Sequence, residues 1–178
     1  NSGVILSLLF RGLSKSLKGM ETAAAAAFAT AMQEGVGAAY KAVMKPAEGT
    51  VLTVSRLAAK RAVDTAAECA DIEEVLAAAI AEGYDALSQT TDMNPVRKKA
   101  GVVDAGGKGY LLILEGMLAE LRGEPMPELR EAEDTHKEKA DFNMMAQEEI
   151  TFTFDTVYVV RKAKEDVDLM PLRAYLSS

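Results

Sequence analysis

The chain contains 178 residues, enough for one core of ordinary size and a smaller appendage. Apolar residues make up 49% of the sequence and aromatic residues only 6%, with no tryptophan, so aliphatic side chains must build the core, which favours closely packed helices. The net charge of -7 has the wrong sign for a nucleic-acid surface, and no apolar run approaches the roughly 18 residues of a membrane span, so we expect a cytoplasmic protein without nucleic-acid partners.

Two long helices are expected at the start of the chain. The first begins at the good N-capping residues of Asn1–Gly3 and carries apolar residues at three- and four-residue spacing until Gly19 ends it. The second runs from about Thr22 to Met44 and contains Gly35 and Gly37 in its interior. Because glycine weakens a helix interior, both glycines are expected at close contacts with another helix.

A sharp break separates the second helix from the third. Pro46 disfavours helical geometry in the preceding residue, and Gly49 relieves the turn. Thr50 then caps the next helix, which should extend to about Cys69. Cys69 is the only cysteine, which excludes an internal disulfide and a cysteine-rich metal site. On a helical face it is expected to be a small buried apolar side chain.

A fourth helix and a short fifth one follow. Asp71 and Glu74 have the spacing of a capping box and predict a helix that ends near Leu87. A short helical piece over residues 95–100 should lead into a glycine-rich stretch, residues 102–109. Four to six helices joined by short turns are typical of an antiparallel helical bundle or helical barrel.

The glycine-rich stretch holds three glycines in four positions, so a turn is expected there rather than a helix. Residues 110–121 after it are apolar enough to form a central buried helix. Backbone amides and the positive end of that helix's dipole make the turn a candidate anion or nucleotide site. The glycines alone favour a helix corner without a ligand, so the candidate site needs further support.

Two further segments are expected after the helical domain of residues 1–122. Residues 123–149 hold nine acidic and three basic side chains, which is typical of a solvated linker, and the lone His136 within it has no neighbour that would suggest a metal site or nucleophile. Residues 150–160 alternate in the manner of a half-buried strand, and residues 168–178 have the pattern of a capped helix. Because a lone strand and helix form no stable sheet, we expect residues 150–178 to be the first βα unit of a second, α/β domain.

Three glycine-bearing turns, at Ser2, Thr50 and Asp104, each open one of the expected helices. In an antiparallel bundle, helices that start at the same end bring their N-termini together. The two hydroxyls, the carboxylate and the backbone amides would then converge on a polyanion such as a nucleotide.

Three blocks of sequence resemble successive parts of one nucleotide-binding domain. They are residues 1–7 (NSGVILS), 41–50 (KAVMKPAEGT) and 99–109 (KAGVVDAGGKG), in this order. On these blocks the chain is similar to the dihydroxyacetone-kinase L-subunit family over residues 1–122, with the closer match to the ATP-binding subunit of bacterial fatty-acid kinase. The resemblance implies a barrel of eight antiparallel helices, incomplete in this chain, with ATP bound at one end.

The resemblance also implies nucleotide-contacting residues, but no catalytic residue and no metal ligand within this chain. The phosphate loop, a second turn and the loop beside the adenosine would contribute Asn1, Ser2, Gly3, Gly49, Thr50, Asp104 and Gly106. The family's magnesium ligands lie in an Asp-Gly-Asp-Thr-Gly motif upstream of the phosphate loop, and the 178 residues contain no such motif. The implied cofactors are therefore ATP and magnesium, with the magnesium ligands expected upstream of residue 1.

Two functions from different classes follow. By resemblance, the parent protein is an ATP-dependent kinase acting on a fatty acid presented by a carrier protein, or on a dihydroxyacetone-like substrate. Since phosphoryl transfer depends on a metal that neutralises the β and γ oxygens, this fragment is expected to be inactive, to bind Mg-ATP weakly, and to self-associate or form a homodimer through uncovered apolar surface. The alternative is a nonenzymatic helical interaction module, whose glycines serve helix packing and whose acidic segment binds a basic partner.

Overall fold

The computed structural model describes residues 2–93, 95–125 and 168–176, and all regular structure within these ranges is helical. The helices are α1 (Ser2–Ser16), α2 (Ala25–Ala42), α3 (Val51–Ala66), α4 (Ile72–Met93), α5 (Pro95–Ala100), α6 (Ala105–Leu121) and α7 (Met170–Leu176). The chain divides into two compact units, residues 1–147 and residues 148–178, and α7 belongs to the second. The mainly helical fold predicted from composition and periodicity is confirmed.

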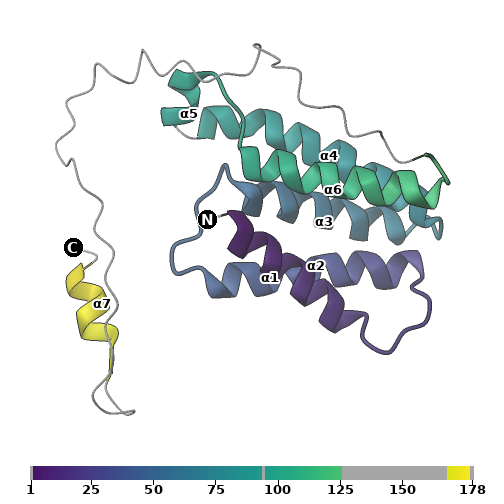
Figure 1. Ribbon diagram of the computed structural model, residues 1–178, viewed down its shortest axis with the longest axis horizontal. Helices are drawn as coiled ribbons and strands as arrows, with labels where there is room; N and C mark the ends of the chain where they lie inside the picture. Colours follow the sequence, from purple (N-terminus) through teal and green to yellow (C-terminus); the bar gives the residue numbers. More distant parts are fainter. Residues whose placement is uncertain (1, 94, 126–167, 177–178) are drawn as a thin grey trace. The chain divides into compact units, whose positions relative to one another are not determined.

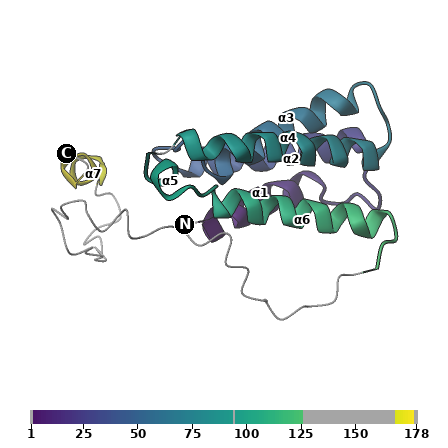
Figure 2. The ribbon, with the colours of Figure 1, turned by 90° about the horizontal axis from the view of Figure 1, so that it is seen from above.

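The long helices of the first unit form an antiparallel bundle (Figure 1). In it α1 packs against α2, α2 against α3, and α3 against α4, while α6 packs against both α3 and α4. Both views show that α1, α3 and α6 begin at one end of the bundle, beside α5, and that α2 and α4 begin at the other (Figure 2). We call the end where α1, α3 and α6 begin the first end, and the opposite one the second end.

Small aliphatic side chains fill the core of this bundle. Five alanines have no exposed surface at all: Ala31, Ala39, Ala58, Ala62 and Ala79. Between them lie the largest fully buried apolar side chains, which are Leu76, Leu111, Leu114, Val54 and Val75. Each fully buried leucine contributes about 1.5–3 kcal/mol, and the alanines let the helix axes approach closely.

The crossing of α1 and α2 is close enough for the two backbones to touch. A Cβ atom added to Gly35 would lie 2.4 Å from the carbonyl oxygen of Leu9, and one added to Gly12 would lie 2.5 Å from the Cα of Gly35. The predicted packing role of Gly35 is therefore confirmed. The same prediction for Gly37 is wrong, because a Cβ at that position would meet nothing within 4 Å.

Most helix boundaries fall near their predicted positions. α1 ends at Ser16, shortly before Gly19, which has a φ of +83°. α4 continues to Met93, so its predicted end near Leu87 is wrong. The reason is that no residue between Leu87 and Pro95 stops a helix, and Leu87 itself remains buried against the core.

The connection between α3 and α4 differs from the prediction in two respects. Asp71 caps α4 as expected, since its Oδ1 accepts the N–H of Glu73 at 2.9 Å. Glu74 does not complete the capping box, because its Oε2 accepts a hydrogen bond from the thiol of Cys69 at 3.1 Å. Cys69 is thus a half-buried donor rather than a buried apolar side chain.

The glycine-rich stretch is helix rather than turn. Gly106, Gly107 and Gly109 lie in the first turns of α6, and the chain turns earlier, over residues 101–104. The prediction failed because the N-terminal turn of a helix can hold glycines when its cap is strong and its neighbours are close. α6 is also not a central buried helix: one face is buried, while Leu112 is 53% exposed.

In the second unit, Asp168 precedes α7, and its Oδ1 accepts the N–H of Met170 at 2.9 Å. Pro171 fits in the first turn of α7, as predicted. The predicted acidic linker, His136 and the predicted strand over residues 150–160 lie outside the described residues. Within the part of the chain that the structure describes, no helix is long and apolar enough to cross a membrane.

Candidate functional site

A pocket of about 520 Å³ opens at the first end of the bundle. It is lined by residues of α1, the end of α2, the α2–α3 connection, α3, α5 and the cap of α6: Ser2, Val4, Ile5, Ala42, Val43, Lys45, Ala47, Thr50, Val51, Leu52, Arg97 and Asp104. Three predicted nucleotide-contacting residues, Ser2, Thr50 and Asp104, are among them. They are far apart in the sequence, and the antiparallel order of the helices brings them together.

The other predicted residues lie in three different places. Gly49 adjoins the pocket, because its carbonyl accepts a hydrogen bond from Arg97. Gly106 is beside Ser2, whose Oγ would lie 2.6 Å from an added Cβ. Gly3 is exposed in the first turn of α1 and does not line the pocket, and Asn1 is outside the described residues.

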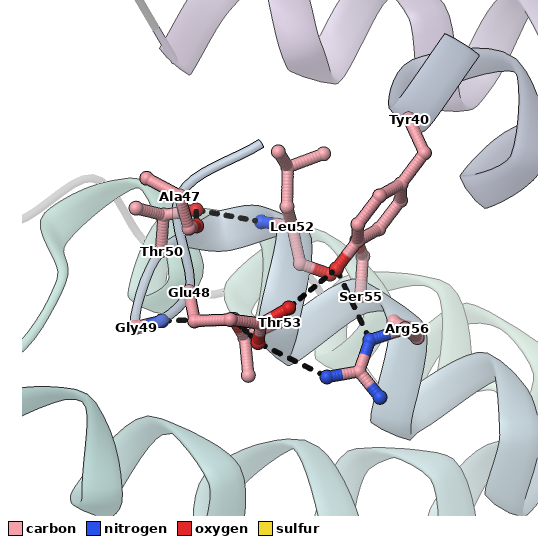
Figure 3. A network of polar contacts seen from close by, with 9 residues as sticks. All are labelled: Tyr40, Ala47, Glu48, Gly49, Thr50, Leu52, Thr53, Ser55 and Arg56. Carbon is pink, nitrogen blue, oxygen red and sulfur yellow. Dashed lines mark hydrogen bonds and ion pairs between the residues drawn. The ribbon is translucent and has the colours of Figure 1, made fainter. Parts of the chain in front are cut away.

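The turn before α3 is fixed by the residues on either side of Thr50 (Figure 3). Gly49 has a φ of +74°, which favours glycine, and an added Cβ would lie 2.7 Å from the Cβ of Met93. The Thr50 hydroxyl accepts the N–H of Leu52 at 3.3 Å and donates to the carbonyl of Ala47 at 2.8 Å. The predicted cap is confirmed, and the hydroxyl of Thr50 is already engaged within the turn.

A network around Glu48 supports the same turn from outside the pocket (Figure 3). The hydroxyl of Thr53 donates to Oε2 of Glu48 at 2.7 Å and accepts the N–H of Gly49 at 2.9 Å. Arg56 pairs with the same carboxylate oxygen at 3.0 Å, and its Nε donates to the hydroxyl of Tyr40 at 3.1 Å. The hydrogen bond from Thr53, helped by Arg56, holds the pKa of Glu48 below its ordinary value, although burial opposes this.

The residue before α6 is fixed equally firmly. Oδ2 of Asp104 accepts the N–H of Gly107 at 2.8 Å, which caps the helix, and Oδ1 pairs with Nη2 of Arg97 at 3.0 Å. The backbone N–H of Asp104 donates to the hydroxyl of Thr90 at 3.1 Å. With only 13% of its side chain exposed, Asp104 is a structural anchor on one wall of the pocket.

Arg97 joins the two walls. One arm of its guanidinium pairs with Asp104 and another donates to the carbonyl of Gly49, so it connects the turn before α3 to the start of α6. Sequence reasoning missed both Arg97 and Lys45, which are the two basic side chains that line the pocket. A signal was present for Arg97, because three successive basic residues follow Pro95 just before the glycine-rich stretch.

Gly106 and Gly107, the first two glycines of α6, serve close packing, whereas a Cβ at Gly109 or Gly116 would meet nothing within 4 Å. An added Cβ at Gly107 would lie 2.9 Å from Cγ2 of Val54 and 3.1 Å from Cδ1 of Leu87. Gly106 makes room for Ser2 in the same way. These glycines therefore let the starts of α1, α3 and α6 lie close together, which positions the amides of three helix N-termini at one end.

Comparison with known proteins decides the family. Residues 1–119 match the DAK2 domain, which covers α1 to α5 and nearly all of α6. The chain belongs to the DAK2 domain family.

The relatives of this DAK2 domain chain are much longer proteins. The chain is 44% identical to Protein YloV of Bacillus subtilis over 185 residues, covering 99% of this chain and 34% of that protein. It is 43% identical to uncharacterized proteins of Staphylococcus saprophyticus and Staphylococcus haemolyticus, covering 92% and 93% of this chain and 30% and 31% of theirs. The chain thus spans about a third of the length of the curated relatives it matches.

The DAK2 family is associated with kinase activity, which supports the predicted family and the coarse class of function. The closer likeness to fatty-acid kinase stays a prediction, since the names of these relatives state no substrate. Among the described residues, no group of three or more histidine, cysteine or acidic side chains is placed to hold a metal ion. Both carboxylate oxygens of Asp104 already have partners, one the N–H of Gly107 and the other the guanidinium of Arg97.

Proposed function

We propose that the pocket at the first end binds the phosphate groups of ATP, and that the DAK2 domain is the nucleotide-binding part of a kinase. The observation that carries this proposal is the convergence of three helix N-termini with Arg97 and Lys45 on one pocket. Helix N-termini and cationic side chains both favour anions. Membership of a family associated with kinase activity supports the choice of a nucleotide over other anions.

The two basic residues have different parts in this proposal. Lys45 is exposed at the rim and meets a phosphate as a mobile point charge. Arg97 is held by Asp104 and Gly49, so the carboxylate offsets its charge and its main part is to keep the pocket in shape. The hydroxyl of Thr50 is engaged in its turn, so α3 contributes mainly through its N-terminal dipole.

The affinity of this chain for ATP is expected to be low. Each helix N-terminus contributes about 0.3–1 kcal/mol at an exposed site, and an exposed lysine contributes a similar amount. Micromolar binding requires about 8 kcal/mol. These contributions alone predict binding weaker than micromolar.

For the longer protein we propose phosphoryl transfer from ATP to a fatty acid presented by a carrier protein, or to a dihydroxyacetone-like substrate. Such transfer needs a divalent metal at the β and γ phosphates. We expect its ligands from an Asp-Gly-Asp-Thr-Gly motif outside these 178 residues. The contribution of this chain is then to bind and orient the triphosphate.

Nitrogen-15 NMR on the 178-residue chain tests the binding step. ATP, ADP and AMP are titrated in turn, and the amides of Gly49, Gly106 and Gly107 report on the pocket. We expect the shifts of these amides to be largest with ATP, smaller with ADP and smallest with AMP. Lys45→Gln should weaken ATP binding about fivefold. The control is Lys18→Gln, which removes an exposed lysine just beyond the end of α1. Shifts confined to other parts of the chain would show that the site is misplaced.

The reaction is tested on a longer protein that contains this chain. ATP consumption is followed with a fatty acid and its carrier, and separately with dihydroxyacetone. We expect turnover with one of them and a loss of most turnover in Arg97→Ala. A longer protein that binds no ATP and turns over neither substrate is not a kinase of this type.

The alternative function, a nonenzymatic interaction module, is favoured by one observation. An apolar groove of about 510 Å³ lies at the second end, lined by Phe28, Ile72, Leu76, Ile113, Gly116, Met117, Glu120 and Leu121. Glycines that serve packing, such as Gly107, also fit this interpretation. The sequence upstream of residue 1 distinguishes the two, since closely spaced aspartates there favour the kinase.

A further inference from the structure

A second groove lies between α1 and α2 and plays no part in the proposed nucleotide site. Its volume is about 470 Å³, and it is lined by Gly12, Lys15, Ser16, Thr30, Glu34, Gly37, Ala38 and Lys41. Its two lysines come from different helices, Lys15 from α1 and Lys41 from α2, and both are exposed. Each wall of the groove therefore carries one lysine, and the α2 wall also carries Glu34, so the lining has one more basic than acidic side chain.

Gly37 leaves open space on the α2 side of the groove. This glycine lies inside α2, where glycine weakens the helix, yet an added Cβ would meet nothing within 4 Å. Gly35, two residues earlier, is needed for the contact with Leu9, so the packing that requires glycine at position 35 does not explain the glycine at position 37. Because Gly37 has no side chain, the α2 wall of the groove does not project at this position, and an added Cβ would not contact any described residue.

The charge around the groove is opposite to that of the chain as a whole. Residues 1–47 contain five basic and two acidic side chains, whereas the whole chain has a net charge of -7. The groove's excess of basic groups therefore fits a partner surface rich in carboxylates. A nucleic acid fits less well, because a long polyanion would extend beyond the groove over a chain whose net charge is -7.

The groove is also next to the nucleotide pocket along α2. Lys41 lines the groove, and the following residue, Ala42, lines the pocket. A protein segment seated in the groove would thus end close to the proposed phosphate site.

We propose that the groove between α1 and α2 docks an acidic segment of the protein that carries the phosphoryl acceptor. The proposal rests on the proposed kinase function. Carboxylates of the partner pair with Lys15 and Lys41, and its backbone lies against the low surface at Gly37 and Ala38. Docking there brings the acceptor to the first end, where the phosphates of ATP would lie.

The test uses the 178-residue chain and a short acetylated peptide of glutamate and alanine as the probe. The amides of Gly12 and Gly37 report on the groove by NMR, separately from the pocket amides of Gly49 and Gly106. We expect the peptide to shift Gly12 and Gly37, and the affinity to fall when the NaCl concentration rises from about 0.05 M to about 0.5 M. A single-stranded oligonucleotide is titrated in parallel.

Three variants separate charge, shape and folding. Lys15→Glu combined with Lys41→Glu should lower the affinity for the peptide about tenfold, since two attractive pairs become repulsive. Gly37→Leu should fill the groove and weaken binding without lowering the thermal midpoint, because its Cβ meets open space. Arg61→Glu, an equally exposed charge reversal on α3, should change nothing.

The outcomes distinguish this proposal from the proposed function. The docking site is wrong if the peptide does not shift the amides of Gly12 and Gly37, or if the double variant binds the peptide as tightly as the unmodified chain. It is also wrong if the oligonucleotide binds at these two amides more tightly than the peptide does. Each of these results holds even when ATP shifts the pocket amides. If the peptide binds as expected and ATP shifts nothing, the groove stands as a surface for acidic segments, whereas the proposed phosphate site in this chain fails and the link of the groove to a phosphoryl acceptor fails with it.

Discussion

The two ends of the bundle are held together by different interactions. At the first end, Arg97 joins the turn before α3 to the start of α6, and Glu48 is bonded to Thr53 and Arg56. At the second end, the helices meet through buried apolar side chains such as Phe28 and Leu76, beside the apolar groove. Charged groups there are confined to the surface, as in the pair of Arg122 with Glu73 at 3.5 Å.

The two kinds of interaction contribute differently to the precise placement of groups and to the free energy of unfolding. A hydrogen bond contributes only about 1 kcal/mol net but fixes a direction, whereas burial of a large apolar side chain contributes about 1.5–3 kcal/mol without fixing one. The first end is therefore suited to hold a charged ligand in a defined position. Buried apolar side chains, at the second end and along the core between the ends, supply much of the free energy that keeps the helices together.

The largest effect is expected at the second end. Leu76→Ala should lower the free energy of unfolding by about 2–5 kcal/mol, because the side chain is only 1% exposed and its removal leaves a cavity. Urea unfolding followed by circular dichroism measures the loss. The control Leu112→Ala, at a residue 53% exposed on α6, should cost less than about 1 kcal/mol. Equal losses would contradict the assignment of stability to buried apolar side chains.

At the first end, Asp104→Ala should cost about 2–3 kcal/mol, since it removes the cap of α6 and the carboxylate partner of a guanidinium that is mostly buried. Asp104→Asn keeps a good capping side chain and removes only the charge. Denaturant titration of both variants should place Asp104→Asn between Asp104→Ala and the unmodified chain. Because both variants lose the ion pair with Arg97, a ranking in which Asp104→Asn is the worse of the two would contradict the capping role of Asp104.

A smaller, pH-dependent effect is expected at Glu48. Its pKa is lowered in the folded chain from an ordinary value of 4.5, so its contribution to stability is fully present above that value and is lost as the pH falls through the lowered pKa. Because the side chain is 56% exposed, the contribution should be below about 1 kcal/mol. Thermal midpoints between neutral and acidic pH should fall more for the unmodified chain than for Glu48→Gln. Parallel curves for the two proteins would rule the contribution out.

The smallest effect is expected for the surface pair at the second end. Arg122→Gln should change the free energy of unfolding by less than about 1 kcal/mol, because both side chains are more than 40% exposed and solvent screens them. The difference should vanish in about 1 M NaCl. A loss comparable to that of Asp104→Ala would remove the distinction between the two ends.

Local sequence signals predicted the parts of the site that depend on local rules. Thr50 follows a break and precedes an apolar run, and it caps α3 as predicted. Asp104 was predicted only to lie in a turn before a helix, and in the structure it caps that helix directly. Arg97 could not be assigned in this way, because its partner Gly49 lies 48 residues earlier and only the packing of the helices brings them together. The two helix-interior glycines of α2 show the same limit, since Gly35 touches α1 and Gly37 touches nothing.

The prediction of a turn in the glycine-rich stretch was wrong for a related reason. Glycine is a poor helix former, but Asp104 caps α6 strongly and the neighbouring helices leave no room for side chains at Gly106 and Gly107. Tertiary packing therefore overrides local propensity there. Only knowledge of Ser2, Val54 and the other contacts would have changed the prediction.

The backbone contact between α1 and α2 limits how the length of this chain can vary among related sequences. One residue inserted in α1 between Leu9 and Gly12 would rotate the following residues by about 100°, and Gly12 would no longer face Gly35. A side chain would then have to fit where only a glycine does. Insertions and deletions should therefore be found in the connection of residues 17–24 and be absent from the helical segments on either side of the crossing.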